Sequence, residues 1–312
     1  MHKPSLTTVK AVVIHRHGGP DELRYEDVDD PVPGAGDIVI KALAIGVNPA
    51  DYKHRDGRLA GFVDYTFPLV LGSDVAGVVV AVGQDVVTPV VGDHVAAMVD
   101  PLRPCAYAEL VRVPAEYAAV IDDDIPFATA AAIPCAALTG TQMIERTLRP
   151  AAGDVVLAIG ATGMVGRFAV RALKAAGAAV IAAARPSYVN AARELGADEV
   201  IAMDGNPWPG APLDAVIDTV GGAAATALAR AVKPSGAIVT VATDPFDVTV
   251  LPVTPVAVGV RPDGARLRGL VDDVAQGLVH VEVAAELPLS DAASAHEMVE
   301  HGGLTGKVIL IP

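Results

Sequence analysis

The pattern of hydrophobic and polar positions divides the chain near residue 125. Before that point, short runs of β-branched residues alternate with glycine and proline, which is typical of a compact, largely antiparallel β domain. The runs are VKAVVIHR (9–16), DIVIKALAIGV (37–47), VAGVVVAVG (75–83), DHVAAMV (93–99) and YAELVRV (107–113).

After residue 125 the pattern becomes alanine-rich and helical, and from 153 to about 260 apolar strands alternate with helices. This alternation predicts a parallel sheet with crossover helices. The strands are DVVLAIG (154–160), AAVIAAA (178–184), EVIAM (199–203), DAVIDTVG (214–221) and GAIVTVA (236–242), with PVAVGV (255–260) as a further strand. Helices are expected at 164–176, at 188–195 and between the strands at 214–221 and 236–242.

A helical period at 263–277 ends the α/β block, and a β pattern then returns in HVEVAAELPL (280–289) and GKVILIP (306–312). A helix from about Ser290 to His301 separates these two runs. We therefore expect one domain made from both chain ends, residues 1–124 and 278–312, and a second domain at 125–277.

Composition and charge exclude some classes of function. The 312 residues fit two domains, and 23 basic against 37 acidic residues give a net charge of −14. A surface of this sign repels nucleic acid and anionic membranes. The apolar strand runs are shorter than the roughly 20 residues that cross a bilayer, and MHKPSLTTVK (1–10) lacks the apolar stretch of a signal peptide. We expect a cytoplasmic protein that binds neither nucleic acid nor membrane.

A glycine-rich turn joins the first parallel strand to the next helix. Gly160, Gly163 and Gly166 follow the strand and precede the helix, which is where a dinucleotide pyrophosphate meets helix N–H groups. The residues expected to hold the pyrophosphate are Gly160, Ala161, Thr162, Gly163, Met164 and Val165. The alternative is a tight turn without a ligand.

The end of the second parallel strand bears on the choice of cofactor. NAD-binding units place an acidic residue there, whereas this chain reads AAARPSY (182–188). Arg185 could pair with a 2′-phosphate, and Ser187 and Tyr188 offer hydroxyl donors. We therefore favour NADPH over NADH, the alternative being that Arg185 is a solvated surface charge.

Several segments together resemble the zinc-independent medium-chain dehydrogenase/reductases, in the quinone oxidoreductase (zeta-crystallin-like) branch. They are NPADYKHRDG (48–57), GSDVAGVVVAVG (72–83), GDHVAAM (92–98), AAIPCAALTG (131–140), IGATGMVG (159–166), ELGADEVI (194–201), DAVIDTVGG (214–222) and GKVIL (306–310). The resemblance implies a GroES-like β domain, a Rossmann domain with a doubly wound parallel sheet, and hydride transfer to quinones or α,β-unsaturated carbonyls. It also implies a homodimer, formed through the edge strand near 255–260.

Metal binding is not expected. Zinc-dependent members of the superfamily use a Cys, a Gly-His-Glu segment and a later Cys, whereas Asn48 or its neighbours and the GSD at 72–74 fill the first two places here. A structural zinc needs more thiolates than the two cysteines of the chain. The closely spaced His15 and His17 more often share one face of a strand than bind metal.

The resemblance and the chemistry together point to catalytic candidates. Reduction puts negative charge on the substrate oxygen, so the site needs hydrogen-bond donors and a proton. Asn48 could donate from its amide and Tyr52 from its phenol, although Asn48 also suits a turn and Tyr52 also suits packing. Asp51 is expected to cap a helix or to pair with Lys53 or Arg55.

Four further residues are candidates for cofactor contact. The resemblance puts Thr139 near the nicotinamide, the alternative being a hydrogen bond to its own helix. Val220, Ala242 and Thr243 follow the carboxyl ends of strands, where such sheets bind ligands.

The sequence predicts an NADPH-dependent reductase of quinones or activated alkenes. A cofactor-binding structural or regulatory protein with little turnover, and a zinc alcohol dehydrogenase, are the alternatives.

Overall fold

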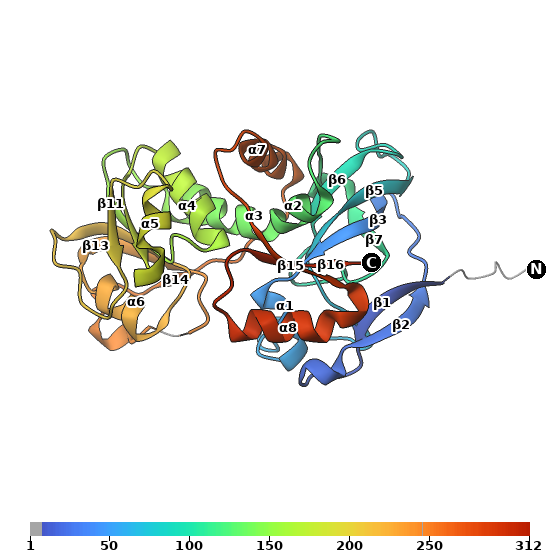
Figure 1. The fold of residues 1–312 in the computed structure, drawn as a ribbon, viewed down its shortest axis with the longest axis horizontal. Coiled ribbons are helices and arrows are strands. Elements are labelled where there is room, and N and C mark those ends of the chain that lie inside the picture. Colours follow the sequence, from blue (N-terminus) through green and yellow to red (C-terminus); the bar gives the residue numbers. More distant parts are fainter. Residues whose placement is uncertain (1–7, 245) are drawn as a thin grey trace, which may run out of the picture. The chain divides into compact units, whose positions relative to one another are not determined.

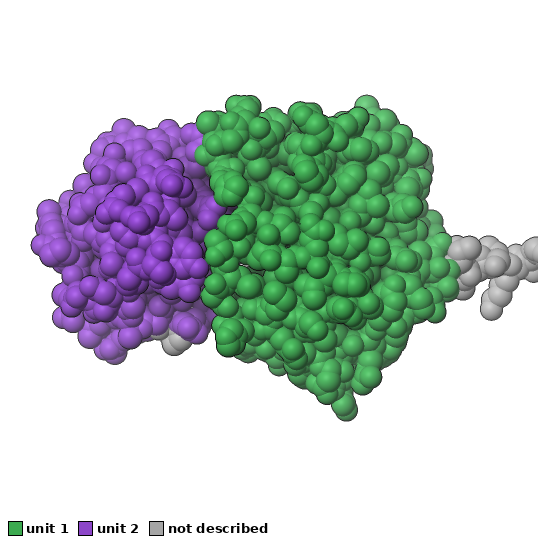
Figure 2. Space-filling view, in the orientation of Figure 1, with its two compact units in different colours: residues 1–135, 261–312 green, residues 136–260 purple. Residues whose placement is uncertain are grey.

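The computed structural model describes residues 8–244 and 246–312 (Figure 1). The chain forms two compact units, which Figure 2 colours separately. The first unit contains the described residues up to Cys135 together with Arg261–Pro312, and the second contains Ala136–Val260. The C-terminal tail therefore lies in the same unit as the N-terminal strands.

The first unit is built on two sheets. A seven-stranded sheet has the order β15-β16-β3-β5-β6-β8, with β7 paired to β3, and a smaller sheet has the order β2-β1-β4. β15 and β16 run parallel, and the other pairs are antiparallel. The strands are β1 (Thr8–Ile14), β2 (Arg24–Asp29), β3 (Asp37–Gly46), β4 (Leu69–Val70), β5 (Asp74–Val82), β6 (His94–Met98), β7 (Leu110–Pro114), β8 (Ala118–Val120), β15 (Val283–Pro288) and β16 (Lys307–Ile311).

Helices of the first unit connect and cover these strands. α1 (Pro49–Asp56) follows β3, α2 (Phe127–Ala132) packs on β3 and β5, and α8 (Ala292–His301) packs on β16 and α1. The remaining helices are α7 (Gly264–Ala275) and the single turns η1 (Pro20–Glu22), η2 (Ala115–Tyr117) and η6 (Leu289–Asp291). Asn48 immediately precedes α1 and Tyr52 lies within it, so the elements that pack on α1 determine the positions of both side chains.

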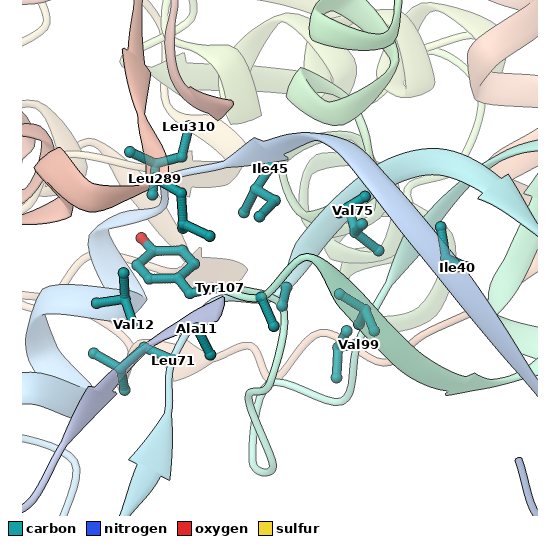
Figure 3. Packing of buried hydrophobic residues seen from close by; sticks show 14 of the residues in the cluster. Ala11, Val12, Ile40, Ile45, Leu71, Val75, Val99, Tyr107, Leu289 and Leu310 are labelled. Atoms are coloured by element: carbon teal, nitrogen blue, oxygen red, sulfur yellow. The ribbon is translucent and has the colours of Figure 1, made fainter. Parts of the chain in front are cut away.

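The core of the first unit is aliphatic apart from one large aromatic ring. Tyr107 has no exposed surface and belongs to the same buried cluster as Val12, Leu71 and Leu289 (Figure 3). Gly72 lies against this ring, because a Cβ atom at Gly72 would come within 2.2 Å of Tyr107. The hydroxyl group of a buried tyrosine needs a hydrogen-bond partner, and the apolar side chains of this cluster cannot provide one.

The second unit contains a parallel six-stranded sheet of order β11-β10-β9-β12-β13-β14. Numbered from β9, this is the order 3-2-1-4-5-6 of the Rossmann fold. Val156 and Ala158 of β9 enter one core cluster and Leu157 and Ile159 another, so both faces of the sheet are covered. The strands are β9 (Val155–Ile159), β10 (Ala179–Ala184), β11 (Glu199–Ala202), β12 (Leu213–Asp218), β13 (Val232–Thr240) and β14 (Val256–Ala257).

The sheet of the second unit is connected by helices. They are α3 (Pro134–Gln142), continued by the π-helical η3 (Met143–Leu148), α4 (Met164–Ala175), η4 (Pro186–Tyr188), α5 (Val189–Arg193), α6 (Gly222–Ala229) and η5 (Val248–Val250). The fold class expected from the sequence, a doubly wound parallel sheet with a GroES-like β domain, is confirmed. The expected helix at 188–195 and the strand at 255–260 are shorter, at Val189–Arg193 and Val256–Ala257.

The two units divide at other residues than the expected 125 and 277. α7 belongs to the first unit because it packs on β8 and η2, and the Arg268 guanidinium donates to the Val120 carbonyl (2.6 Å). A Cβ atom at Gly264 would come within 2.3 Å of the Ala118 carbonyl oxygen, so the approach is close. A helical period alone gives no sign of which unit will bury the helix.

The longest apolar helical run is Phe127–Leu148. Its 22 residues satisfy the length and hydropathy of a membrane-spanning helix, but 78% of its most apolar window is buried inside the protein. This burial is typical of a core helix.

Candidate functional site

The glycine turn occupies the carboxyl end of β9, as the sequence predicts. Gly160 has a φ of +77°, and α4 begins at Met164. The Gly160 and Ala161 N–H groups donate to the Ala183 carbonyl (3.0 and 3.2 Å), and the Gly163 N–H donates to Gly160 (3.0 Å). Met164 and Val165 lie in the first helical turn, where N–H groups lack partners within the helix. The turn can therefore present N–H groups to an anion at its helical end.

Close packing explains two of the three glycines. A Cβ atom at Gly166 would lie 2.2 Å from the Gly160 carbonyl oxygen, and one at Gly160 would lie 2.3 Å from Thr219 Oγ1. A Cβ atom at Gly163 would meet its nearest atom at 3.3 Å. Gly160 and Gly166 thus bring strand, turn and helix together, whereas the exposed Gly163 leaves space where a ligand could approach.

Asp218 organises the neighbouring strand ends. This buried carboxylate accepts from the Val220 and Gly221 N–H groups (both 3.0 Å) through one oxygen and from the Thr240 hydroxyl (2.8 Å) through the other. The Thr240 hydroxyl in turn accepts from the Ala242 N–H (3.0 Å). The segments that follow β12 and β13 are therefore held in fixed positions beside the glycine turn.

Val220, Ala242 and Thr243 lie in these two segments. Val220 is 44% exposed, which is unusual for a valine directly after a buried strand. Ala242 is partly buried and Thr243 is exposed. The three residues are thus placed at the carboxyl edge of the sheet, beside the point between β9 and β12 where the strand order reverses.

Arg185, Ser187 and Tyr188 follow β10, the strand beside β9. The Arg185 guanidinium lies over the Tyr188 ring, 4.8 Å from the ring centre, while Arg185 and Ser187 are exposed. The ring holds the cation at the sheet edge without neutralising it. Arg185 is thus available for an anionic ligand.

Thr139 is 93% buried on α3, and its neighbour Gly140 packs against α4. A Cβ atom at Gly140 would lie 2.3 Å from the Val165 carbonyl oxygen. Thr139 therefore comes close to the first turn of α4.

A cavity of about 460 Å³ beside Trp208 opens at the amino ends of β9 and β10. It lies at the opposite edge of the sheet from the glycine turn and is not part of the candidate site.

Asn48 lies in the first unit, where it is buried with two charged residues. Its Nδ2 donates to Asp74 Oδ2 (2.9 Å), and its Oδ1 accepts from Lys307 Nζ (2.5 Å). Lys307 Nζ also donates to Asp74 Oδ2 (3.1 Å). Asn48 is 4% exposed, Asp74 0% and Lys307 6%. The sequence did not identify Asp74 or Lys307 as site residues.

Tyr52 is partly buried on α1, and two basic side chains lie near its ring. Lys53 Nζ lies 5.7 Å and the Arg58 guanidinium 5.0 Å from the centre of the Tyr52 ring. The Tyr52 ring thus contacts two cations, and its hydroxyl group remains a candidate proton donor.

Asp51 caps α1, which is one of the two roles that we expected for it. Its Oδ2 accepts from the Asn48 backbone N–H (2.7 Å) and from the Tyr107 hydroxyl (3.0 Å). Its Oδ1 is buried and has no hydrogen-bond partner among the described residues. Burial raises the pKa of Asp51 to about 7, against the lowering effect of the Asn48 N–H and the Tyr107 hydroxyl.

The network continues from Tyr107 to α8. The Tyr107 hydroxyl lies 3.1 Å from His296 Nε2, and Arg55 donates to His296 Nδ1 (3.1 Å). Because arginine can only donate, the proton of the neutral ring must be on Nε2. Burial, and then the charge of Arg55, lower the pKa of His296 to about 3. Arg55 also pairs with Glu300, so α1 is linked to α8.

The metal-binding side chains in the part of the chain that the structure describes do not form a cluster. Across the described ranges, no three His, Cys, Asp or Glu side chains lie close enough together to bind an ion. His15 contacts Glu26 (3.0 Å), whereas His17 bonds to the His54 carbonyl (3.1 Å), so the two histidines turn to different partners. The Lys307 ammonium against Asn48 and Asp74 would repel a second cation.

The functional residues that the sequence analysis missed share one signal. Asp74, Asp218 and Lys307 are each a charge within or at the end of an apolar strand, in GSDVAG (72–77), LDAVID (213–218) and KVILI (307–311). A charge in such a run is buried and must find a partner. The partners of Asp74 and Lys307, however, are distant in sequence and could not be identified.

Two family models match the chain. Residues 34–123 match the alcohol dehydrogenase GroES-like domain, and residues 195–310 match a model described as zinc-binding dehydrogenase. The first match lies within the first unit, and the second begins in the second unit and continues past Val260 into the C-terminal part of the first unit.

Individual proteins match over nearly the whole length. The quinone oxidoreductase of Pseudomonas aeruginosa is 29% identical, over 97% of this chain and 99% of the relative. A 2-haloacrylate reductase from a Burkholderia species is also 29% identical, with the same coverage. A mycobacterial protein solved in complex with NADPH has a TM-score of 0.81 at 28% identity, covering 97% of this chain and all of that one. The glycine turn, the strand order and these matches agree, and the chain belongs to the medium-chain dehydrogenase/reductase superfamily, in its quinone oxidoreductase branch.

Proposed function

We propose that the protein is an NADPH-dependent reductase that transfers hydride to a quinone or an α,β-unsaturated carbonyl without a metal. Membership of the family makes it an oxidoreductase that uses a nicotinamide cofactor on a small molecule. Among the relatives, one is named a quinone oxidoreductase and another a 2-haloacrylate reductase. Quinones and acrylates both carry a carbon–carbon double bond conjugated to a carbonyl group, so one kind of site can serve both.

The observation that carries the proposal is the glycine turn at the start of α4. The residues fit a dinucleotide because the turn leaves space at Gly163 and ends in helical N–H groups beside the point where the strand order reverses. Gly160, Ala161, Thr162, Gly163, Met164 and Val165 would surround the pyrophosphate. Thr139, Val220, Ala242 and Thr243 would contact the nicotinamide half.

The preference for NADPH rests on Arg185. No acidic residue stands at the end of β10 to bind a ribose 2′-hydroxyl, and Arg185 lies there with Ser187 and Tyr188. A guanidinium can bind a 2′-phosphate with two hydrogen bonds. The mycobacterial relative solved with NADPH supports the same choice.

The bound nicotinamide would supply the hydride, and the residues of this chain manage the charge that results. Negative charge develops on the substrate oxygen, and Asn48 is the donor that we assign to it. Asn48 has a second amide hydrogen besides the one it gives to Asp74. Tyr52, whose ring lies near two cations, is the candidate for the proton that completes the reduction. Water could deliver that proton instead.

The test is the loss of NADPH absorbance at 340 nm with a panel of small quinones and enones. We expect turnover with at least one member and no stimulation by added zinc. Tight NADPH binding without turnover on any member would favour the alternative, a cofactor-binding structural or regulatory protein. Activity that chelators abolish and zinc restores would contradict the metal-free chemistry.

The same family relationship leads us to propose a homodimer. β14 is one of the two edge strands of the described parallel sheet, and its Val256 is 51% exposed. An exposed edge strand can pair with its copy in a second chain. Light scattering of the purified protein at 31.8 kDa would contradict this proposal.

A further inference from the structure

Three side chains that are distant in sequence meet in the first unit. Asn48 precedes α1, Asp74 begins β5 and Lys307 begins β16. Lys307 Nζ lies 2.5 Å from Asn48 Oδ1 and 3.1 Å from Asp74 Oδ2, and Asn48 Nδ2 lies 2.9 Å from Asp74 Oδ2. Each of the three groups thus contacts the other two.

The charges at this site determine how the Asn48 amide is oriented. A lysine ammonium can only donate and a carboxylate can only accept, so the amide oxygen must face Lys307 and the amide nitrogen must face Asp74. The reverse orientation would place donor against donor and acceptor against acceptor. Lys307 therefore fixes the direction of the second N–H of Asn48.

Stability alone is a poor reason for this arrangement. Lys307 and Asp74 form an ion pair whose side chains are 6% and 0% exposed. Replacing a buried ion pair by apolar residues is often neutral or stabilising, so stability alone does not explain why these two charges are buried here. The chain also makes room for it, because a Cβ atom at Gly46 would come within 3.1 Å of Lys307 Cε.

Asp74 also holds a neighbouring backbone segment of the first unit in place. Asp74 Oδ1 accepts from the Cys135 N–H (2.8 Å), and Cys135 lies in the first turn of α3. Asn48 is itself the candidate donor to the substrate oxygen.

We propose that Lys307 is a positioning residue for the reduction. Its ammonium group holds the Asn48 amide oxygen, so the free amide N–H of Asn48 keeps the direction in which it donates to the substrate oxygen. A cation on the amide oxygen also makes that N–H a stronger donor, because hydrogen bonds in a chain polarise one another. This inference rests on the proposed function, in which Asn48 receives the developing negative charge.

The experiment is a double-mutant cycle on the full-length protein with NADPH and the best quinone or enone. It compares the wild type with Asn48→Ala, Lys307→Met and the double variant. We expect each single substitution to lower kcat about 100-fold, the usual effect of losing one donor to a developing oxyanion. The double variant should be no slower than the slower single variant, because both changes remove the same hydrogen bond.

Two outcomes would overturn the inference. One is a folded Lys307→Met protein whose kcat is close to that of the wild type. The other is a pair of losses that multiply in the double variant, which would mean that Lys307 acts independently of Asn48. Affinity for NADPH, measured by fluorescence, should stay unchanged in all variants, since a general disturbance of the fold would lower it.

Lys307→Met leaves the Asp74 carboxylate buried without its cation, so the protein could fail to fold. The neutral double variant Asp74→Asn/Lys307→Met avoids that charge, and its kcat should be about 100-fold below that of Asp74→Asn alone. Equal values for these two variants would also overturn the inference.

Lys174→Met is the matched control. It breaks the surface ion pair with Asp198 on the second unit and should leave kcat unchanged. If the wild type binds no NADPH or reduces no substrate, the proposed function fails. If it does both and the lysine substitution has no effect, only the inference about Lys307 fails.

Discussion

Substituting Asp51 by Asn tests whether the buried carboxyl of α1 carries a proton at neutral pH. Asp51 is fully buried, and one of its oxygens has no partner within the described part of the chain. Burial raises its pKa from 3.8 to about 7. An amide has the shape of a protonated carboxyl, so Asp51→Asn should keep the hydrogen bonds from Asn48 and Tyr107 while removing the titration.

The sign follows from linkage. A carboxyl whose pKa is higher in the folded than in the unfolded chain stabilises the fold at low pH, and this contribution is lost as pH rises through the folded value. The pKa shift of Asp51 corresponds to about 4 kcal/mol in total. About 3 kcal/mol of this falls between pH 5 and pH 8. Over that range the free energy of unfolding of Asp51→Asn should therefore rise by about 3 kcal/mol relative to the wild type.

Calorimetric unfolding at pH 5, 6, 7 and 8 measures this difference. The single tryptophan of the chain, Trp208, lies in the second unit, so tryptophan fluorescence would not follow unfolding of the unit that contains Asp51. His296 also titrates differently in the folded and unfolded chains, because its folded pKa is about 3. It is present in both proteins, and its contribution cancels in the difference.

Asp198→Asn is the control for this experiment. The hydrogen bond from Lys174 lowers the pKa of Asp198 below its ordinary value, so its charge does not change between pH 5 and pH 8. The free energy of unfolding of Asp198→Asn should differ from that of the wild type by the same amount at all four pH values. A difference for Asp51→Asn that is equally constant would refute the reasoning, because it would show Asp51 ionised throughout.

Two further predictions concern the second unit. Arg185→Ala should lower the affinity for NADPH at least tenfold and leave the affinity for NADH nearly unchanged, because only NADPH carries the 2′-phosphate. The control is Arg193→Ala, which changes a surface arginine of α5. An equal loss of affinity for both cofactors in titration calorimetry would contradict the assignment. Gly166→Ala should destabilise the protein by about 1–3 kcal/mol, because its Cβ atom would lie 2.2 Å from the Gly160 carbonyl oxygen. Gly269→Ala in α7, where the nearest atom is 3.4 Å away, should instead raise stability by about 0.5–1 kcal/mol, and similar thermal unfolding of both variants would rule out the close packing.

Local sequence patterns were enough to predict most of the strands and helices, their order along the chain and the fold class. Strands buried on both faces, such as VVLAI (155–159), are continuous apolar runs, and glycines at Gly160 and Gly166 occupy positions that tolerate no side chain. These signals are local, because each depends on residues within a few positions of one another. The parallel sheet and the glycine turn could therefore be located without coordinates.

Local signals failed where a strand has no apolar face. β2, RYEDVD (24–29), has no buried residue and was not predicted. It forms because its backbone pairs with β1 along the register Thr8 to Asp29 through Val13 to Arg24. Likewise, the period of α7 predicted a helix, but only packing against β8 assigned it to the first unit.

Which buried charges lie in contact follows from the three-dimensional fold and not from local sequence. Lys307 is 259 residues from Asn48, and His296 is 189 residues from Tyr107, so neither pair leaves a pattern in the sequence. Burial forces such groups to find partners, but it does not specify which partner, since that depends on how β16 and α8 return to the first unit. The sequence thus identified Asn48 as a candidate donor, and only the fold showed that its side chain is hydrogen-bonded to Lys307 and Asp74.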